Sequence, residues 1–232
     1  MKKDNKIVLN IPHSSFNGII SDKGGWTPNA NLINQAIKDT DWHTDFLFQD
    51  NSNKKVVPCV FDYSRYYVDA ERLVNDPLEK ERRGILYTDI NGFKRTLSDG
   101  IKQALMFVRE KFLNRICREI TSDTVLIDCH SFNNEVAPDI EICIGFNDDW
   151  SKPDDDTING IVKIFKDSGY KVGINNPYSN SITPEKDNGY KSIMIEVNKK
   201  LYLRNGIEIN VDTRYAPRLS STIKKVYNFV LG

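Results

Sequence analysis

The sequence has no excess of charge of either sign, because its 32 lysines and arginines are balanced by 32 aspartates and glutamates. This balance argues against nucleic acid or an anionic lipid surface as a partner, although a local cationic pocket is compatible with it. No apolar run approaches the roughly 20 residues that a membrane-spanning helix needs. The charged start MKKDNK leads into only a short apolar stretch, unlike a signal peptide. We therefore expect a cytoplasmic protein that binds neither nucleic acid nor membranes.

Cysteine is also scarce. The four cysteines, Cys59, Cys117, Cys129 and Cys143, are scattered along the chain without a Cys-x-x-Cys pair. Three of them lie in apolar segments typical of strands. Because thiolate metal sites and redox motifs use closely spaced pairs, this pattern favours buried, reduced thiols.

What remains is the composition of an ordinary globular protein, with 39% hydrophobic and 28% charged residues. Short β-branched runs alternate with segments of helical periodicity, which predicts an α/β fold, a three-layer sandwich with a mixed, largely parallel central sheet. Without an internal repeat or linker, one domain over residues 1–232 is expected. Pro58 favours an edge position or a bulge for its strand. Strands are predicted at 6–11, 56–61, 124–129, 140–145, 170–174 and 192–197, and helices at 29–49, 97–120, 155–168 and 215–231. Within 29–49, the run Asp39-Thr40-Asp41 is a candidate for a break or for the start of a second helix.

Histidine occurs only three times, and two of the three share one kind of position. His13 follows the predicted strand at 6–11, and His130 follows the strand at 124–129. In an open α/β sheet, ligands bind beyond the carboxyl ends of the strands, where the two imidazoles can converge. Converging imidazoles are typical ligands of a divalent metal, whereas a single histidine at a strand end is more often structural.

A third ligand is needed from another segment, because zinc in a hydrolase takes three protein ligands and keeps one position for water. The run DTDWHTD at 39–45 is the obvious source. If it is helical, Asp41 and Asp45 lie one turn apart on the same face. We predict Asp41 as the ligand, with Asp45 or His43 as alternatives. The competing interpretation is that Asp39 and Asp41 are helix-capping residues.

One acid inside an apolar strand is a candidate general base. Glu196 lies in the run SIMIEVN at 192–198. Burying a lone carboxylate is costly unless the group is paired or functional. At or near a strand end it would face the same crevice, where burial beside a metal could tune its proton affinity. The alternative is a structural ion pair with an arginine.

Two arginines in the stretch 63–72 are predicted to bind anions. Arg72 can hold a carboxylate through two parallel hydrogen bonds, and Arg65 can do the same or stabilise a tetrahedral oxyanion. An isolated arginine is usually a surface residue, so the surface interpretation stands beside this one.

Six motifs, taken in order, resemble the N-formylglutamate amidohydrolase family over most of the chain. No single motif is specific for this family, but the set of six in this order is. The motifs are IPHSS at 11–15, DTDWH at 39–43, Ser64-Arg65 with Val68-Asp69 and Arg72, IDCHSF at 127–132, NPY at 176–178, and IEVN at 195–198 followed by Tyr202.

The resemblance implies a phosphorylase/hydrolase-like α/β fold, similar to that of zinc carboxypeptidases. It implies hydrolysis of N-formyl-L-glutamate, a small anionic acyl-amino-acid, to formate and L-glutamate, a late step of histidine degradation. It also implies one Zn²⁺ per chain, with another divalent ion as the alternative. Carried over by residue, it places His13, Asp41 and His130 on the metal, makes Glu196 and Arg65 catalytic, and assigns substrate binding to Arg65, Arg72, Ser131, Asn176 and Tyr178.

Two other functions are compatible with the same residues. One is a related metallohydrolase that acts on another acylated amino acid or on a cell-wall-type peptide. Ser15 and the run Ser179-Asn180-Ser181 stand where related chains often carry glycine, which alters the rim of the pocket. The other is an inactive homologue that binds a carboxylate ligand. A serine hydrolase is disfavoured, because Ser14 and Ser131 adjoin histidines but no Gly-x-Ser-x-Gly motif is present.

Overall fold

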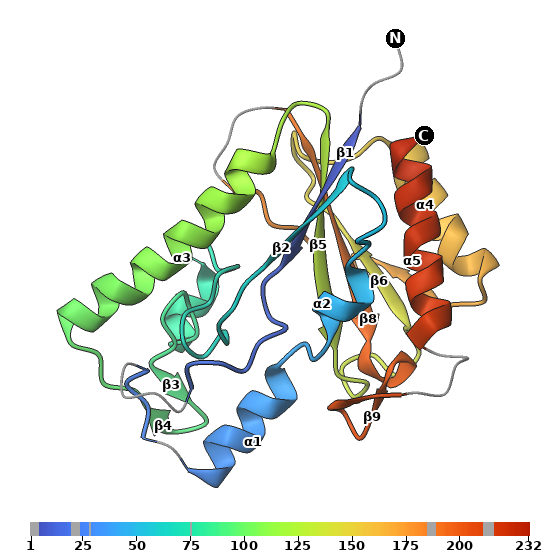
Figure 1. Ribbon diagram of the computed structural model, residues 1–232. Coiled ribbons are helices and arrows are strands. Elements are labelled where there is room, and N and C mark those ends of the chain that lie inside the picture. The colour runs from blue at the N-terminus through green and yellow to red at the C-terminus, as the bar shows by residue number, and fades with distance from the viewer. Residues whose placement is uncertain (1–4, 20–23, 28, 75, 185–188, 211–215) are drawn as a thin grey trace.

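A six-stranded sheet forms the centre of the computed structural model, which describes residues 5–19, 24–27, 29–74, 76–184, 189–210 and 216–232 (Figure 1). The strand order is β2-β1-β5-β8-β6-β7, and every neighbouring pair is parallel except β8 with β6. The prediction of a mixed, largely parallel sheet is therefore confirmed. Pro58 lies on the edge strand β2, as predicted. The strands are β1 (Lys6–Ile11), β2 (Val56–Val60), β5 (Thr124–Phe132), β6 (Ile142–Gly145), β7 (Val172–Ile174) and β8 (Lys191–Asn198).

Helices cover both faces of this sheet, which gives the predicted three layers. Alternate residues of β1 point to opposite faces, as the strand period requires. Ile7 and Leu9 pack in the core shared with α4 (Asp155–Asp167) and α5 (Ala216–Leu231), whereas Val8 packs in the core shared with α3 (Asp99–Glu119). Figure 1 shows α3 on one side of the sheet and α4 and α5 on the other.

Local signals fix the ends of the helices. The Ser98 side chain accepts a hydrogen bond from the Ile101 amide and caps α3. Gly169, with φ of 86°, follows the cap residue of α4. Tyr215, the predicted start of the last helix, lies outside the described residues. No helix in the described part of the chain is long and apolar enough to cross a membrane. The thiols of Cys59, Cys129 and Cys143 are buried and reduced.

One predicted boundary near the site was wrong. Strand β5 continues past Cys129 to Phe132, so His130 lies within the strand and not after it. The helical segment 29–49 is interrupted, as the run Asp39-Thr40-Asp41 suggested: α1 (Ala30–Asp39) ends at Asp39 and α2 (Thr44–Phe48) begins at Thr44. Between them, His43 has a φ of 60°, a left-handed conformation that interrupts helical hydrogen bonding.

Several short elements carry too few residues for a periodic pattern and were not predicted. They surround the carboxyl ends of the central strands and the segment after β2. They are the 3₁₀ helices η1 (Pro77–Glu81) and η2 (Lys199–Leu201), the hairpin of β3 (Asp89–Ile90) and β4 (Phe93–Lys94), and the hairpin of β9 (Leu203–Arg204) and β10 (Glu208–Ile209).

Candidate metal centre

The candidate site lies where the parallel strands β1, β5 and β8 end. His13 follows β1 by two residues, and His130 pairs in register with Glu196 of the neighbouring strand β8. The centroids of the two imidazole rings are 5.2 Å apart. Both histidines are buried. The parallel register thus brings together three side chains from distant parts of the chain.

A buried carboxylate holds one ring nitrogen of each histidine. Oδ1 of Asp69 lies 2.9 Å from Nε2 of His13, and Oδ1 of Asp128 lies 2.9 Å from Nε2 of His130. Both aspartates are fully buried. Carboxylates commonly orient metal-binding histidines in this way, leaving the other ring nitrogen for the metal.

The opposite nitrogens, Nδ1 of both rings, face the same carboxylate. Oδ2 of Asp41 lies 3.3 Å from Nδ1 of His130 and 3.8 Å from Nδ1 of His13. The Nη2 group of Arg65 contacts Nδ1 of His13. Because a guanidinium only donates, that imidazole nitrogen carries the lone pair that a metal ligand needs.

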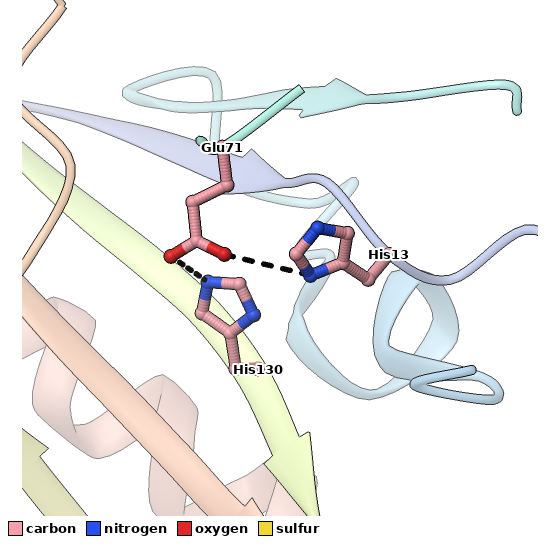
Figure 2. A group of neighbouring side chains, drawn as sticks. All are labelled: His13, Glu71 and His130. Carbon is pink, nitrogen blue, oxygen red and sulfur yellow. Dashed lines mark ion pairs between the residues drawn. The ribbon is translucent and has the colours of Figure 1, made fainter. Parts of the chain in front are cut away.

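Glu71 supplies a second carboxylate at the site, and the sequence analysis missed it. Figure 2 shows its carboxylate facing both rings, with ion-pair distances of 3.6 Å to Nδ1 of His13 and 3.2 Å to Nε2 of His130. Ligand atoms of His13, Glu71 and His130 all lie within 4.8 Å of one another. This group could therefore hold a metal ion. The available signal was a second acid two residues after Asp69 in the run VDAER.

The charges of the site are set by burial and by the neighbouring carboxylates. Burial, reinforced by Arg65, lowers the pKa of His13, so that its imidazole is neutral. Burial also opposes the charged form of His130, but Glu71 and Asp128 outweigh it and raise the pKa of that imidazole well above its usual value. Against its own burial, the charge of His130 lowers the pKa of Glu71 to about 2. Metal binding at His130 would therefore release a proton.

A cavity of about 310 Å³ opens beside the histidines. Most of the predicted site residues line it. His13 is buried behind the lining residues, and Asn176 is exposed outside the cavity, two residues before Tyr178. The alternative ligands His43 and Asp45 do not line it either. The cavity is lined by Asp39, Asp41, Arg65, Glu71, Arg72, Leu78, His130, Ser131, Phe132, Asn133, Tyr178, Ser179, Met194, Glu196 and Lys199.

Glu196 is buried in the cavity wall, and its Oε2 atom has no hydrogen-bond partner in the part of the chain that the structure describes. Burial raises its pKa to about 8; His130 opposes this effect, and Asp41 and Glu71 add to it. No ion pair joins Glu196 to an arginine among the described residues, which disfavours the structural alternative considered for this acid. A carboxyl group with a pKa near neutrality can both accept and return a proton.

Both predicted arginines line the cavity and are anchored by the same acids that surround the histidines. Nη2 of Arg65 lies 3.7 Å from Oδ2 of Asp41, and Nε of Arg72 lies 3.7 Å from Oδ2 of Asp69. At 3.7 Å neither guanidinium makes a short hydrogen bond to its carboxylate partner. Apart from the Nη2 group of Arg65, which contacts His13, the guanidinium groups therefore keep N–H donors available for an anionic ligand.

Comparisons with known proteins identify a matching family model and similar solved structures. A family model described as N-formylglutamate amidohydrolase matches residues 109–203, which include His130 and Glu196. The fold is similar to the crystal structure of an N-formylglutamate amidohydrolase from Ralstonia eutropha JMP134, with a TM-score of 0.78, 15% identity, and coverage of 98% of this chain and 94% of that one. It is also similar to a gene product of Agrobacterium tumefaciens, with a TM-score of 0.63, 15% identity, and coverage of 99% and 92%. A search of curated protein sequences gave no match.

Proposed function

We propose that the chain, whose residues 109–203 match the family model described as N-formylglutamate amidohydrolase, is a member of that family. In this proposal it is a zinc-dependent hydrolase of small N-acyl amino acids, with N-formyl-L-glutamate as its substrate. The observation that carries the proposal is a pair of carboxylate-held imidazoles, with ring centroids 5.2 Å apart, beside a cavity. One of these imidazoles, His130, lines the cavity together with two arginines and a buried acid, one of whose oxygens has no hydrogen-bond partner among the described residues. The products would be formate and L-glutamate.

The donor set fits a zinc ion, since mixed nitrogen and oxygen ligation suits this metal. We assign the ligands to His13, His130 and Asp41. Asp69 and Asp128 each hold the Nε2 of one ring, and Asp41 faces the Nδ1 of both. Glu71 faces Nδ1 of one ring but Nε2 of the other, where Asp128 is already closer. When bound, the ion would polarise the scissile carbonyl and acidify a water molecule.

The protein's own side chains supply the remaining steps. Glu196 would take a proton from the attacking water and return it to the leaving amine, which its raised pKa suits. Arg65, beside His13, would stabilise the oxyanion. Arg72 would bind a substrate carboxylate, and Ser131 and Tyr178 would form the adjoining cavity wall. Holding the substrate in this way converts binding energy into orientation of the amide.

The proposal is tested with purified protein loaded with zinc. We expect it to release formate from N-formyl-L-glutamate, to lose activity after exhaustive chelation, and to regain it when zinc is restored. A panel of N-acetyl and N-succinyl amino acids and a cell-wall-type peptide separates this substrate from those of related hydrolases. Absence of bound metal together with absence of turnover on the whole panel would instead support the inactive, carboxylate-binding homologue.

A further prediction concerns the carboxylate that orients His13. We expect Asp69→Asn to weaken zinc binding by about 10- to 100-fold, because an amide is a poorer acceptor for the Nε2 proton and no longer increases the basicity of the ring. Zinc affinity is measured by competition with a chelating dye. The matched control is Asp76→Asn, since Asp76 caps η1, a role that asparagine can also perform, and lies 4.0 Å from Arg72. Equal affinities in the two variants would contradict this role of Asp69.

A further inference from the structure

Lys199 is a buried cation of the cavity that the mechanism does not use. Its exposed fraction is 5%, and it lies in η2, three residues after Glu196. Lysine is seldom buried to this extent without a compensating partner or a function. Its ammonium group donates one hydrogen bond, of 2.7 Å, to the carbonyl of Lys38 at the end of α1. This bond fixes the position of Nζ between two neighbouring cavities that Lys199 lines, 3.9 Å from Oδ1 of Asp41 in the wall of the candidate site.

The ammonium group has donor capacity to spare. It carries three N–H donors, whereas the hydrogen bond to Lys38 uses one of them. Among the described residues, the acid that forms an ion pair with it is Asp41, whose Oδ1 lies 3.9 Å away, beyond hydrogen-bonding distance. An anionic group entering the cavity can therefore accept a charge-assisted hydrogen bond from Lys199 without displacing an existing one.

The cationic groups of the cavity come from two separate parts of the chain. Arg65 and Arg72 belong to the segment after β2 and are anchored by Asp41 and Asp69, whereas Lys199 follows β8. Cations on separate elements of one cavity of about 310 Å³ suit a ligand that carries two separated anionic groups.

We infer that Lys199 is the specificity-determining residue for a dicarboxylic substrate. Its ammonium group binds the side-chain carboxylate, while an arginine binds the α-carboxylate. This inference rests on the proposed function and adds to it the reason why an acidic amino acid is preferred over a neutral one of the same shape.

The test variant is Lys199→Gln, which removes the charge and keeps an N–H donor for the carbonyl of Lys38. The matched control is Lys200→Gln. Lys200 is the next residue, is exposed, donates a hydrogen bond of 2.7 Å to the carbonyl of Pro138, and lines a neighbouring cavity but not this one. Thermal unfolding of both variants shows whether the fold is retained.

Two substrates of equal shape separate recognition from a structural role. For N-formyl-L-glutamate, we expect Lys199→Gln to lower kcat/KM about 10- to 100-fold, mainly through KM, because a hydrogen bond between two charged groups is lost. For N-formyl-L-glutamine, the value should stay within about threefold. Lys200→Gln should resemble the wild type with both. Equal losses on the two substrates, or loss of the preference in Lys200→Gln instead, would overturn the inference.

Binding of L-glutamate and L-glutamine, measured by calorimetry, makes the inference independent of turnover. Glutamate binding that is selectively weakened by Lys199→Gln supports the role of Lys199 even if the wild type hydrolyses no acyl amino acid, in which case the proposed function fails alone. Hydrolysis with no difference between glutamate and glutamine binding overturns the role of Lys199 and leaves the proposed function standing.

Discussion

Glu196→Gln is expected to retain its metal and to lose turnover by about 10²- to 10⁴-fold, the usual contribution of general acid–base catalysis. Glutamine keeps the size of the side chain but cannot accept the proton of the attacking water. The loss should fall on kcat and leave KM almost unchanged, because Glu196 is assigned to proton transfer and not to substrate binding. The raised pKa of this buried carboxyl is consistent with that role.

Steady-state kinetics and zinc analysis of the same preparation check this result. Glu208→Gln is the control, because Glu208 also lies on a strand, β10, but is exposed and outside the cavity. A near-normal kcat in Glu196→Gln would remove the general-base assignment. Loss of zinc from this variant would instead make Glu196 part of the metal site.

Replacement of either site histidine by alanine should abolish stoichiometric zinc binding and, with it, detectable hydrolysis. In the proposed assignment each imidazole supplies one of three protein ligands, and two ligands alone are expected to lose the ion at micromolar zinc. His43→Ala is the control, because it removes the third histidine, which lies outside the cavity. Metal analysis after gel filtration checks the prediction. Full zinc occupancy in His13→Ala or His130→Ala would refute the ligand assignment.

The same measurement distinguishes the two carboxylates at the site. We expect Asp41→Asn to lose most of its zinc, because Asp41 faces the Nδ1 atoms that Asp69 and Asp128 leave available. We expect Glu71→Gln to retain it. The reverse outcome would assign the ligand role to the group formed by His13, Glu71 and His130.

The main elements of the fold could be predicted because their apolar periodicity is long enough to read. A run such as TVLIDC has the composition of a strand covered on both faces, and β5 is such a strand. Its last three residues were missed because His130 and Ser131 are polar, and their burial depends on groups that pack against them from other elements. Short hairpins and 3₁₀ helices have no period, so tertiary contacts alone determine them.

The site was predictable where a residue type is rare and its strand position is readable. His13, His130 and Glu196 met both conditions. Glu71 did not, because acids are abundant in this sequence and its segment has no regular secondary structure. The role of Asp69 depends on a hydrogen bond across 56 positions of the chain, which no local pattern reveals. The sequence left open whether the segment at 39–45 is helical, because its backbone conformation depends on contacts with a distant segment, including the hydrogen bond from the Asp41 amide to the His13 carbonyl.

The reversed direction of β6 affects how the mouth of the cavity is built. Consecutive parallel strands need a long crossover, usually a helix, whereas an antiparallel strand can begin at the edge where the preceding one ended. The chain therefore passes from β5 to β6 through residues 133–141 alone, and Asn133 of this connection lines the cavity. The length and composition of this connection can change during evolution without disturbing β1, β5 and β8, the strands that position the histidines and Glu196. Substrate range in this protein can thus diverge at the rim while the chemistry beneath it stays the same.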